Sequence, residues 1–184
     1  MPERMRWKRK IARTPRDFER WQRDLPEDPY ERVAAIMERL DELREMREGP
    51  SFRAMMQRLG DHDLREFVSS YIEAALWSST DNSEESGGSS LDENFNEDDV
   101  AVESIEEAIA ESKAFIETNK DLLDAVGNYS QHGHDFWLTR NGHGVGFCDR
   151  GYGEIGEKLT EAAEAYGGKS AFVSDYGQIY FQPG

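Results

Sequence analysis

The stretch His134-Asp-Phe-Trp-Leu-Thr139, joined through Arg140-Asn141-Gly142-His143 to Gly144-Val-Gly-Phe-Cys-Asp149, decides the fold that the sequence predicts. Apolar residues occupy every second position on both sides of Asn141-Gly142. An Asn-Gly pair between two such runs is typical of a β-hairpin with a type I′ turn. We therefore predict two antiparallel strands at this point of the chain.

The two-residue loop fixes which residues of this hairpin face each other. Phe136 is expected opposite Phe147, and Leu138 opposite Val145, so that one apolar face of the strand pair lies in the core. On the other face Trp137 would lie over bare glycine backbone, either as a cover for its own strands or where the backbone of a partner comes close.

The polar residues of the hairpin form a candidate site. His134 is expected to oppose Asp149 as a cross-strand pair, while Arg140 and His143 would lie at the exposed tip. The residues of this hairpin motif that we consider as a candidate site are His134, Asp135, Trp137, Arg140, His143, Asp149 and Arg150.

The rest of the C-terminal third continues this pattern. Apolar residues between 155 and 166 recur at helical spacing, and residues 171–174 and 178–181 read as a second hairpin. The C-terminal part is therefore predicted as ββαββ. The fold class is α+β: helices at the N-terminal side, with a small antiparallel sheet packed on them.

Helices are predicted throughout the first two thirds of the chain. Thr14-Pro15 and Asp28-Pro29 are typical helix starts, and Gly49-Pro50 is a typical stop. A short helix is expected over residues 51–59, followed by longer ones after Asp63 and over 103–123. The predicted organisation is a basic helical extension over residues 1–62 and an acidic α+β domain over 63–184, with an acidic loop at 80–100.

Charge is distributed unevenly along the 184 residues, whose net charge is −16. Residues 1–60 hold 15 basic and 12 acidic side chains, whereas residues 61–184 hold 7 and 26. A surface this acidic repels nucleic-acid phosphates, which argues against a protein that mainly coats DNA or RNA.

The acidic charge is densest between Asp81 and Glu111, where 12 acidic residues occur with no basic one. Such a run is either a solvated loop or a surface that binds a partner. The residues predicted to form a partner-binding surface are Asp92, Glu93, Glu97, Asp98, Asp99 and Glu103.

The N-terminal residues have the opposite character. Residues 1–13 contain six basic side chains, no helix cap and no regular apolar spacing, so we expect an arm that is ordered only by binding, either to nucleic acid or to the acidic loop of the same chain. As an alternative function, this arm would bind phosphates and stack on bases. The residues that would do so are Arg6, Trp7, Lys8, Arg9, Lys10 and Arg13.

Three patterns resemble cofactor or metal sites, and each lacks a requirement of that site. Gly151-x-Gly153-x-x-Gly156 spells a dinucleotide-binding motif, but Glu154 would repel a pyrophosphate and no βαβ unit is predicted. The hairpin register separates His134 from His143 by about 20 Å, which is too far for one metal ion. We expect neither a cofactor nor a metal.

A calcium loop is the third pattern. Asp92, Asn94, Asn96 and Glu103 match positions of an EF-hand loop, but Glu97 stands where that loop needs glycine. No nucleophile–base arrangement is predicted either, so we do not expect an enzyme, although the His134–Asp149–Arg150 end of the hairpin would be the place for one.

The cysteine content and the lack of long apolar segments indicate the expected cellular compartment. There is one cysteine, Cys148, which fits a reducing compartment, and there is no run of about 18 or more apolar residues and no leader-like segment. We expect a protein of the host-cell cytoplasm without a membrane partner; the oligomeric state stays open.

The motif residues resemble a known family. The similarity is to a family of small acidic phage and prophage proteins of uncharacterised activity, and it covers about residues 64–184. It is carried by Tyr71–Asp81, Leu91–Phe95, Gly133–Phe147 and Asp149–Gly153. The resemblance implies a phage or mobile-element origin and says little about activity.

Two functions remain in competition. The first is an accessory protein that binds a host protein, with its acidic surface mimicking DNA in the groove of a nucleic-acid-binding enzyme or complex, as anti-restriction or other anti-defence proteins would. The second is a nucleic-acid-associated accessory protein that uses the basic arm. A structural role in the virion is a third alternative.

Overall fold

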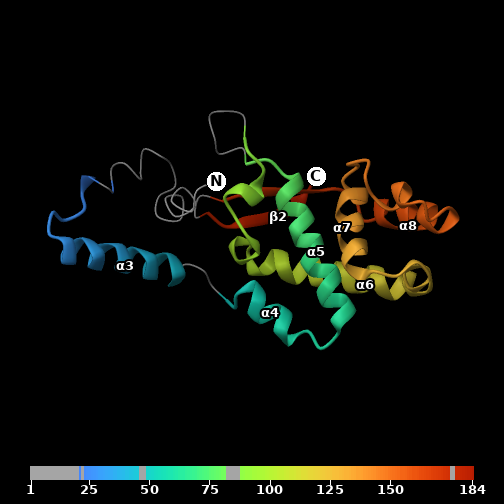
Figure 1. Ribbon diagram of the computed structural model, residues 1–184, viewed down its shortest axis with the longest axis horizontal. Helices are drawn as coiled ribbons and strands as arrows, with labels where there is room; N and C mark the ends of the chain where they lie inside the picture. Colours follow the sequence, from blue (N-terminus) through green and yellow to red (C-terminus); the bar gives the residue numbers. More distant parts are fainter. Residues whose placement is uncertain (1–20, 22, 46–48, 82–87, 175–176) are drawn as a thin grey trace.

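The structure is a computed structural model that describes residues 21, 23–45, 49–81, 88–174 and 177–184 (Figure 1). The described chain is mostly helical, with one two-stranded antiparallel sheet. Its elements are α3 (Pro29–Glu45), α4 (Phe52–Arg58), α5 (His62–Ser78), α6 (Val102–Val126), α7 (Tyr129–Arg140), α8 (Glu154–Glu164), β1 (Lys169–Val173) and β2 (Ile179–Pro183), with the short 3₁₀ turns η1 (Leu91–Glu93), η2 (Glu97–Asp99) and η3 (Phe147–Arg150).

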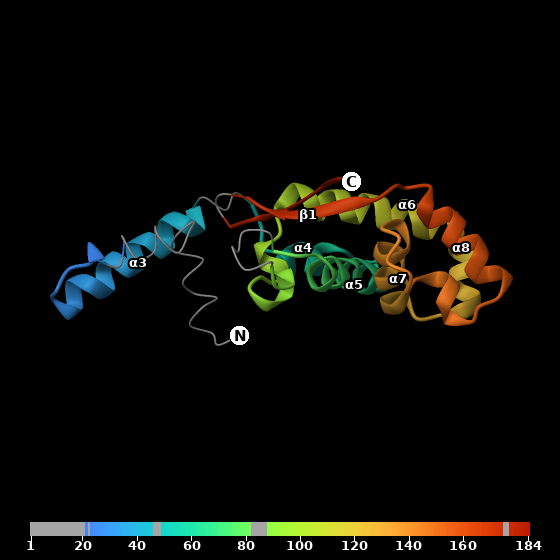
Figure 2. The same cartoon turned by 90° about the horizontal axis from the view of Figure 1, so that it is seen from above.

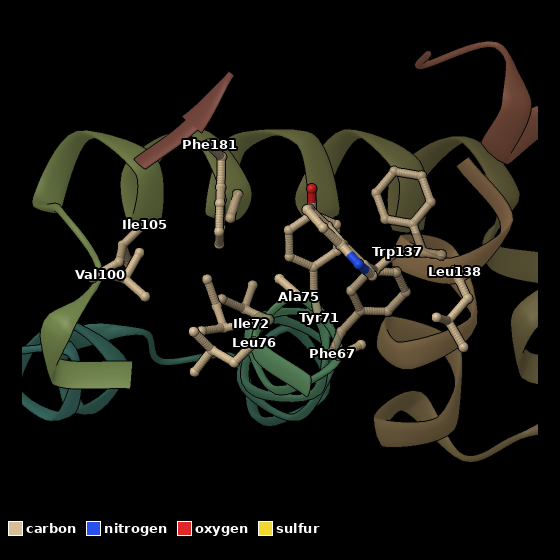
Figure 3. Packing of buried hydrophobic residues seen from close by; sticks show 14 of the residues in the cluster. Phe67, Tyr71, Ile72, Ala75, Leu76, Val100, Ile105, Trp137, Leu138 and Phe181 are labelled. Atoms are coloured by element: carbon tan, nitrogen blue, oxygen red, sulfur yellow. The ribbon is translucent and has the colours of Figure 1, made fainter. Parts of the chain in front are cut away.

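The core is organised around α5. Asp61 caps this helix by accepting hydrogen bonds from the backbone N–H groups of Asp63 and Leu64. The helix that the sequence predicts after Asp63 is confirmed, and Phe67 and Tyr71 are fully buried on it. Figure 3 shows how side chains from α5, α7 and β2 meet there, with Phe181 pointing from the sheet toward α5.

Helices α5 and α7 pack closely enough to exclude a side chain between them. Gly133 lies inside α7, and a Cβ atom at this position would lie 1.9 Å from the backbone oxygen of Phe67. Glycine normally weakens a helix, so its presence here is explained by the close approach of the two backbones.

The first predicted hairpin is wrong. Residues 129–140 form α7, and η3 follows the turn that ends it, so the ββαββ arrangement is absent from the described chain. Phe136 and Phe147 are both buried, but they do not face each other across strands, and Val145 is 49% exposed. The sequence pattern did not predict this helix because α7 packs against other elements on several sides. It therefore lacks the one-sided apolar stripe that marks a surface helix.

The Asn-Gly pair ends a helix instead of joining two strands. Gly142 has a φ of 67°, and its N–H donates to the carbonyl oxygen of Thr139. The side chain of Asn141 donates to the carbonyl oxygen of Trp137. A helix C-terminus and a type I′ turn both favour a residue with positive φ, so the same dipeptide fits either structure.

The second predicted hairpin is confirmed. Strands β1 and β2 are antiparallel, with Ala171 opposite Phe181 and Phe172 opposite Tyr180. The helix predicted between the hairpins is confirmed as α8, and the helix predicted over 103–123 as α6. On one face of this sheet Ile179 and Phe181 are buried in the core, whereas Phe172 on the other face is 39% exposed.

The N-terminal helix α3 extends away from the remaining elements (Figures 1 and 2). Its predicted cap is confirmed, since Asp28 accepts hydrogen bonds from the N–H groups of Tyr30 and Glu31. The apolar side chains of Tyr30 and Val33 are exposed on it. The helix predicted at Thr14 lies outside the described residues, and within the described residues no helix is long and apolar enough to span a membrane.

Candidate interaction surface

The described part of the acidic run, residues 88–111, forms η1, η2 and the first turns of α6. Thr80 and Ser90 form an antiparallel bridge, which closes the loop after α5 and directs the chain into η1 and η2. The carbonyl oxygen of Ile179 in β2 then accepts a hydrogen bond from the N–H of Ala101, which fixes the start of α6 beside the sheet. The acidic side chains are therefore held on short, hydrogen-bonded turns and on the first turns of a long helix.

Five of the six predicted surface acids are accessible. Four are exposed and Glu97 is half-buried; the exposed residues are Asp92, Glu93, Asp98 and Glu103. Glu106, which is not among the predicted surface acids, is also exposed on α6, one helical turn beyond Glu103. We call these six residues the acidic surface: Asp92, Glu93, Glu97, Asp98, Glu103 and Glu106.

Asp99, which was predicted to belong to this surface, is buried instead, with 1% exposure. Its carboxylate accepts a hydrogen bond from the backbone N–H of Asn96, while Asn96 accepts one from the N–H of Asp98. This reciprocal capping box stabilises η2. Asp99 therefore shapes the segment and does not present its charge to solvent.

The charges of the acidic surface are not neutralised by the rest of the described chain. Its six residues form no ion pair with any described Lys, Arg or His, whereas further along α6 Lys113 pairs with Glu117 and Lys120 with Asp124. Accessible carboxylates without counter-charges create a negative potential that attracts cationic partners. This surface can act by electrostatic recognition.

Most residues of the motif stabilise the fold. Asp135 is fully buried, and the partly exposed guanidinium of Arg150 holds its carboxylate with three hydrogen bonds of 2.7–3.1 Å. Gln131 donates a further hydrogen bond to the same carboxylate. The ion pair ties η3 to α7, so this end of the motif is used for packing.

Arg140 is a second buried charge with a structural role. Its guanidinium donates to Glu111 on α6 at 2.6 Å and to the hydroxyl of Tyr71 on α5 at 3.0 Å. It also donates to the carbonyl oxygens of Tyr166 and Gly167, which follow α8. Burial raises the pKa of Tyr71, so this phenol stays neutral in the network. The predicted position of Arg140 at an exposed tip is wrong because α7 ends inside the core.

Trp137 and His134 each bond to the C-terminal end of α5. The indole N–H of Trp137 donates to the hydroxyl of Ser78, and that of Trp77 donates to Nε2 of His134. Trp137 is 1% exposed, so the predicted glycine-lined surface around it is wrong. His134 does not oppose Asp149, because helical geometry turns its ring toward α5.

The remaining motif residues lie on the surface without a common site. His143 and Asp149 are exposed, and so is the free thiol of Cys148. In the described part of the chain, no cluster of three or more His, Cys, Asp or Glu side chains is placed to hold a metal ion.

The residues of the calcium-loop and dinucleotide patterns are used in turns. Asn94 is buried and its amide donates to Ser89. Gly151 and Gly153 have positive φ angles of 73° and 58° around the start of α8. The first turn of α8 carries Glu154, which disfavours an anion at that helix end.

The residues of the alternative nucleic-acid interface, Arg6, Trp7, Lys8, Arg9, Lys10 and Arg13, lie outside the described residues. Comparison with protein-family models, with curated proteins and with solved structures gives no match to this chain. The resemblance to phage and prophage proteins stays a prediction from the motif residues. The candidate function therefore depends on the accessible carboxylates of the acidic surface.

Proposed function

We propose that this chain is an accessory protein of a phage or mobile element that binds a host nucleic-acid-binding protein through its acidic surface, as a mimic of DNA. The observation that supports the proposal is the set of accessible carboxylates on η1, η2 and the first turns of α6, none of them paired with a described cation. The phage origin depends on the motif resemblance alone.

An ordered acidic segment is better suited to mimic DNA than a disordered acidic segment would be. A disordered acidic tail attracts cations but pays an entropy cost when it is ordered by binding. Here the bridge between Thr80 and Ser90 and the capping box of Asn96 already order the segment. A fixed array of negative charges can match the spacing of cations in a phosphate-binding groove.

The chemistry of the partner follows from that of the surface. The acidic surface offers acceptors only, so the complementary surface must carry Lys or Arg side chains, as the DNA-binding grooves of nucleases, restriction enzymes and polymerases do. Binding by such a surface weakens with rising salt concentration.

The test is affinity purification from a bacterial host lysate with a charge-reversal variant. Glu93→Lys, Asp98→Lys and Glu106→Lys change three exposed side chains and spare the buried Asp99. The matched control is Glu157→Lys, Glu161→Lys and Glu164→Lys, which makes the same change of charge on exposed positions of α8. We expect the wild-type chain and the control to capture a nucleic-acid-binding protein that duplex DNA displaces.

The variant of the acidic surface should lose this capture while it remains folded, because exposed substitutions change stability little. Equal capture by both triple variants would contradict the proposal, since overall charge would then explain binding. Capture of nucleic acid in place of protein, lost on deletion of residues 1–13, would favour the alternative function of the basic arm.

A further inference from the structure

Among the described residues, some backbone groups on the outer edge of β1 have no hydrogen-bond partner. In the ladder, the N–H of Ser174 donates to Gln178 and the N–H of Gly184 donates to Gly168, at 2.8 and 2.9 Å. Hydrogen-bonded positions alternate along an antiparallel pair. Even-numbered residues of β1 therefore bond to β2, and odd-numbered residues direct their N–H and C=O groups away from it.

Several odd-numbered groups at the two borders of the sheet have partners in the described chain, whereas those in the middle of β1 do not. On the outer side of β2, Ile179 accepts from Ala101 and Phe181 donates to the hydroxyl of Ser104. At the start of β1, the N–H of Lys169 donates to the side chain of Asn141. In the described chain no further strand joins the sheet, so the N–H and C=O groups of Ala171 and Val173 have no pairing strand.

This edge lacks the features that usually keep strands apart. Charged side chains, proline and bulges commonly protect exposed edges. Residues 170–174 are Ser-Ala-Phe-Val-Ser, without charge or proline, and the register with β2 has no bulge. In Figure 2 β1 lies in front of α6 with no other element drawn over it.

An aromatic pair lies beside the free edge. Phe172 and Tyr180 are cross-strand neighbours on the outward face of the sheet, with ring centroids 5.6 Å apart and planes at 25°. Phe172 is 39% exposed, so a large apolar side chain marks the centre of the unpaired edge. Apolar surface and free backbone groups together favour an added strand.

We propose that the edge of β1 pairs with the same edge of a second copy of this chain, with a two-fold axis at Phe172. Ala171 of one copy then lies opposite Val173 of the other, and the two reciprocal pairs satisfy all the free backbone groups of Ala171 and Val173 in both copies. Phe172 faces its own counterpart between them, and the result is a four-stranded antiparallel sheet in the order β2–β1–β1–β2.

A second copy suits this edge because the contact is neutral. Each chain carries a net charge of −16, so two copies repel each other wherever acidic residues meet. Residues 170–173 of β1 bring no charge to the contact, and the ammonium group of Lys169 is buried in ion pairs with Glu107 and Glu111. The proposal goes beyond the proposed function and does not depend on it, since it needs neither a host protein nor nucleic acid.

The first test is sedimentation of the purified full chain over a range of concentrations. We expect a shift toward twice the monomer mass with rising concentration, and a stronger shift at high salt, where repulsion is screened. Phe172→Lys places two like charges at the two-fold axis and should weaken the dimer by about tenfold or more. The control Gln182→Lys adds the same charge on β2 and should behave as the wild type.

The second test maps the register with a disulfide, in a chain that also carries Cys148→Ser. Phe172→Cys places two cysteines in a non-hydrogen-bonded pair with Cα atoms about 4.5 Å apart, which a disulfide can span. Oxidation should give a covalent dimer with Phe172→Cys and not with the control Gln182→Cys. A wild-type chain that stays monomeric at every concentration, or equal cross-linking of both cysteine variants, overturns the proposal.

Discussion

At the scale of single residues, His132 is a titratable group in an apolar environment. Its side chain is fully buried beside the rings of Tyr129, Phe147 and Tyr152, and neither ring nitrogen has a side-chain hydrogen-bond partner among the described residues. Burial lowers the pKa of His132, and the backbone of Leu123 and the carboxylate of Asp135 oppose this shift only in part. The folded state therefore favours the neutral imidazole.

The lowered pKa predicts how the free energy of unfolding depends on pH. Below the ordinary histidine pKa of about 6.5, the unfolded chain binds a proton that folded His132 does not, so the free energy of unfolding falls as pH decreases below that value. His132→Phe removes this proton uptake and should flatten the dependence between about pH 7 and pH 5.

Urea unfolding at matched ionic strength measures this effect. Phe115→Leu provides the control, because it changes another buried ring of the core without removing a titratable group and should leave the pH dependence as it is in the wild type. If His132→Phe and the wild type lose the same free energy between the two pH values, His132 is not held neutral by the fold.

Single residues also show where sequence reasoning stops. Asp99 and Asp98 are adjacent acids in the same run, yet one is buried in a capping box and the other is exposed. Gly133 fits the beginning of a strand as well as a helix contact with Phe67. Which alternative holds is decided by residues distant in sequence, so composition can predict an acidic surface but not each of its members.

At the scale of elements, the C-terminal hairpin and the helices α6 and α8 were predictable from sequence, whereas α7 was not. Turn residues and apolar spacing within a few positions define β1, β2 and α8. Helix α7 owes its burial to α5 and to the ion pairs of Asp135 and Arg140, which join it to Arg150 and Glu111. Such long-range partners leave no local pattern, and Asn141-Gly142 then favoured the wrong element.

A substitution at Asn141 distinguishes the helix end from a hairpin turn. Type I′ turns accept Asp-Gly as readily as Asn-Gly, so Asn141→Asp would be nearly neutral in a hairpin. In the structure it removes the hydrogen bond to Trp137 and adds a negative charge at the C-terminus of α7. We expect a loss of about 1–2 kcal/mol in the free energy of unfolding.

The same helix offers the matched control at its other end. Asn128 caps α7 by accepting a hydrogen bond from the N–H of Gln131, and an aspartate can accept that bond as well. Asn128→Asp should therefore be neutral or stabilising, since negative charge is favourable at a helix N-terminus. Denaturant unfolding of both variants decides the matter, and a neutral Asn141→Asp would contradict the assignment of α7.

At the scale of the whole molecule, the charge distribution separates two classes of carboxylate. Glu111 and Asp135 are paired with Arg140 and Arg150 inside the fold, where solvent ions screen poorly. The acidic surface has no such partners in the described chain. The fold is thus stabilised by a few buried ion pairs and opposed by repulsion among many exposed acids.

This separation predicts that salt stabilises the free protein. Raising the ionic strength from about 0.01 M to 1 M shortens the Debye length from about 30 Å to 3 Å and screens the exposed acids, while the buried pairs change little. We expect the melting temperature to rise by a few degrees, which corresponds to about 1 kcal/mol in a chain of this size. Sodium chloride is the appropriate salt, because sulfate would also strengthen apolar burial.

The charge-reversal variants locate the repulsion that salt screens. Glu93→Lys, Asp98→Lys and Glu106→Lys relieve the acidic surface, so this variant should melt at a higher temperature than the wild type in low salt and gain less from added salt. The stabilised variant is also the one expected to lose its partner, because the same carboxylates that repel each other in the free chain attract a cationic groove. A melting temperature that falls with salt would show instead that attraction between opposite charges dominates, and that the acidic surface is already neutralised within the chain.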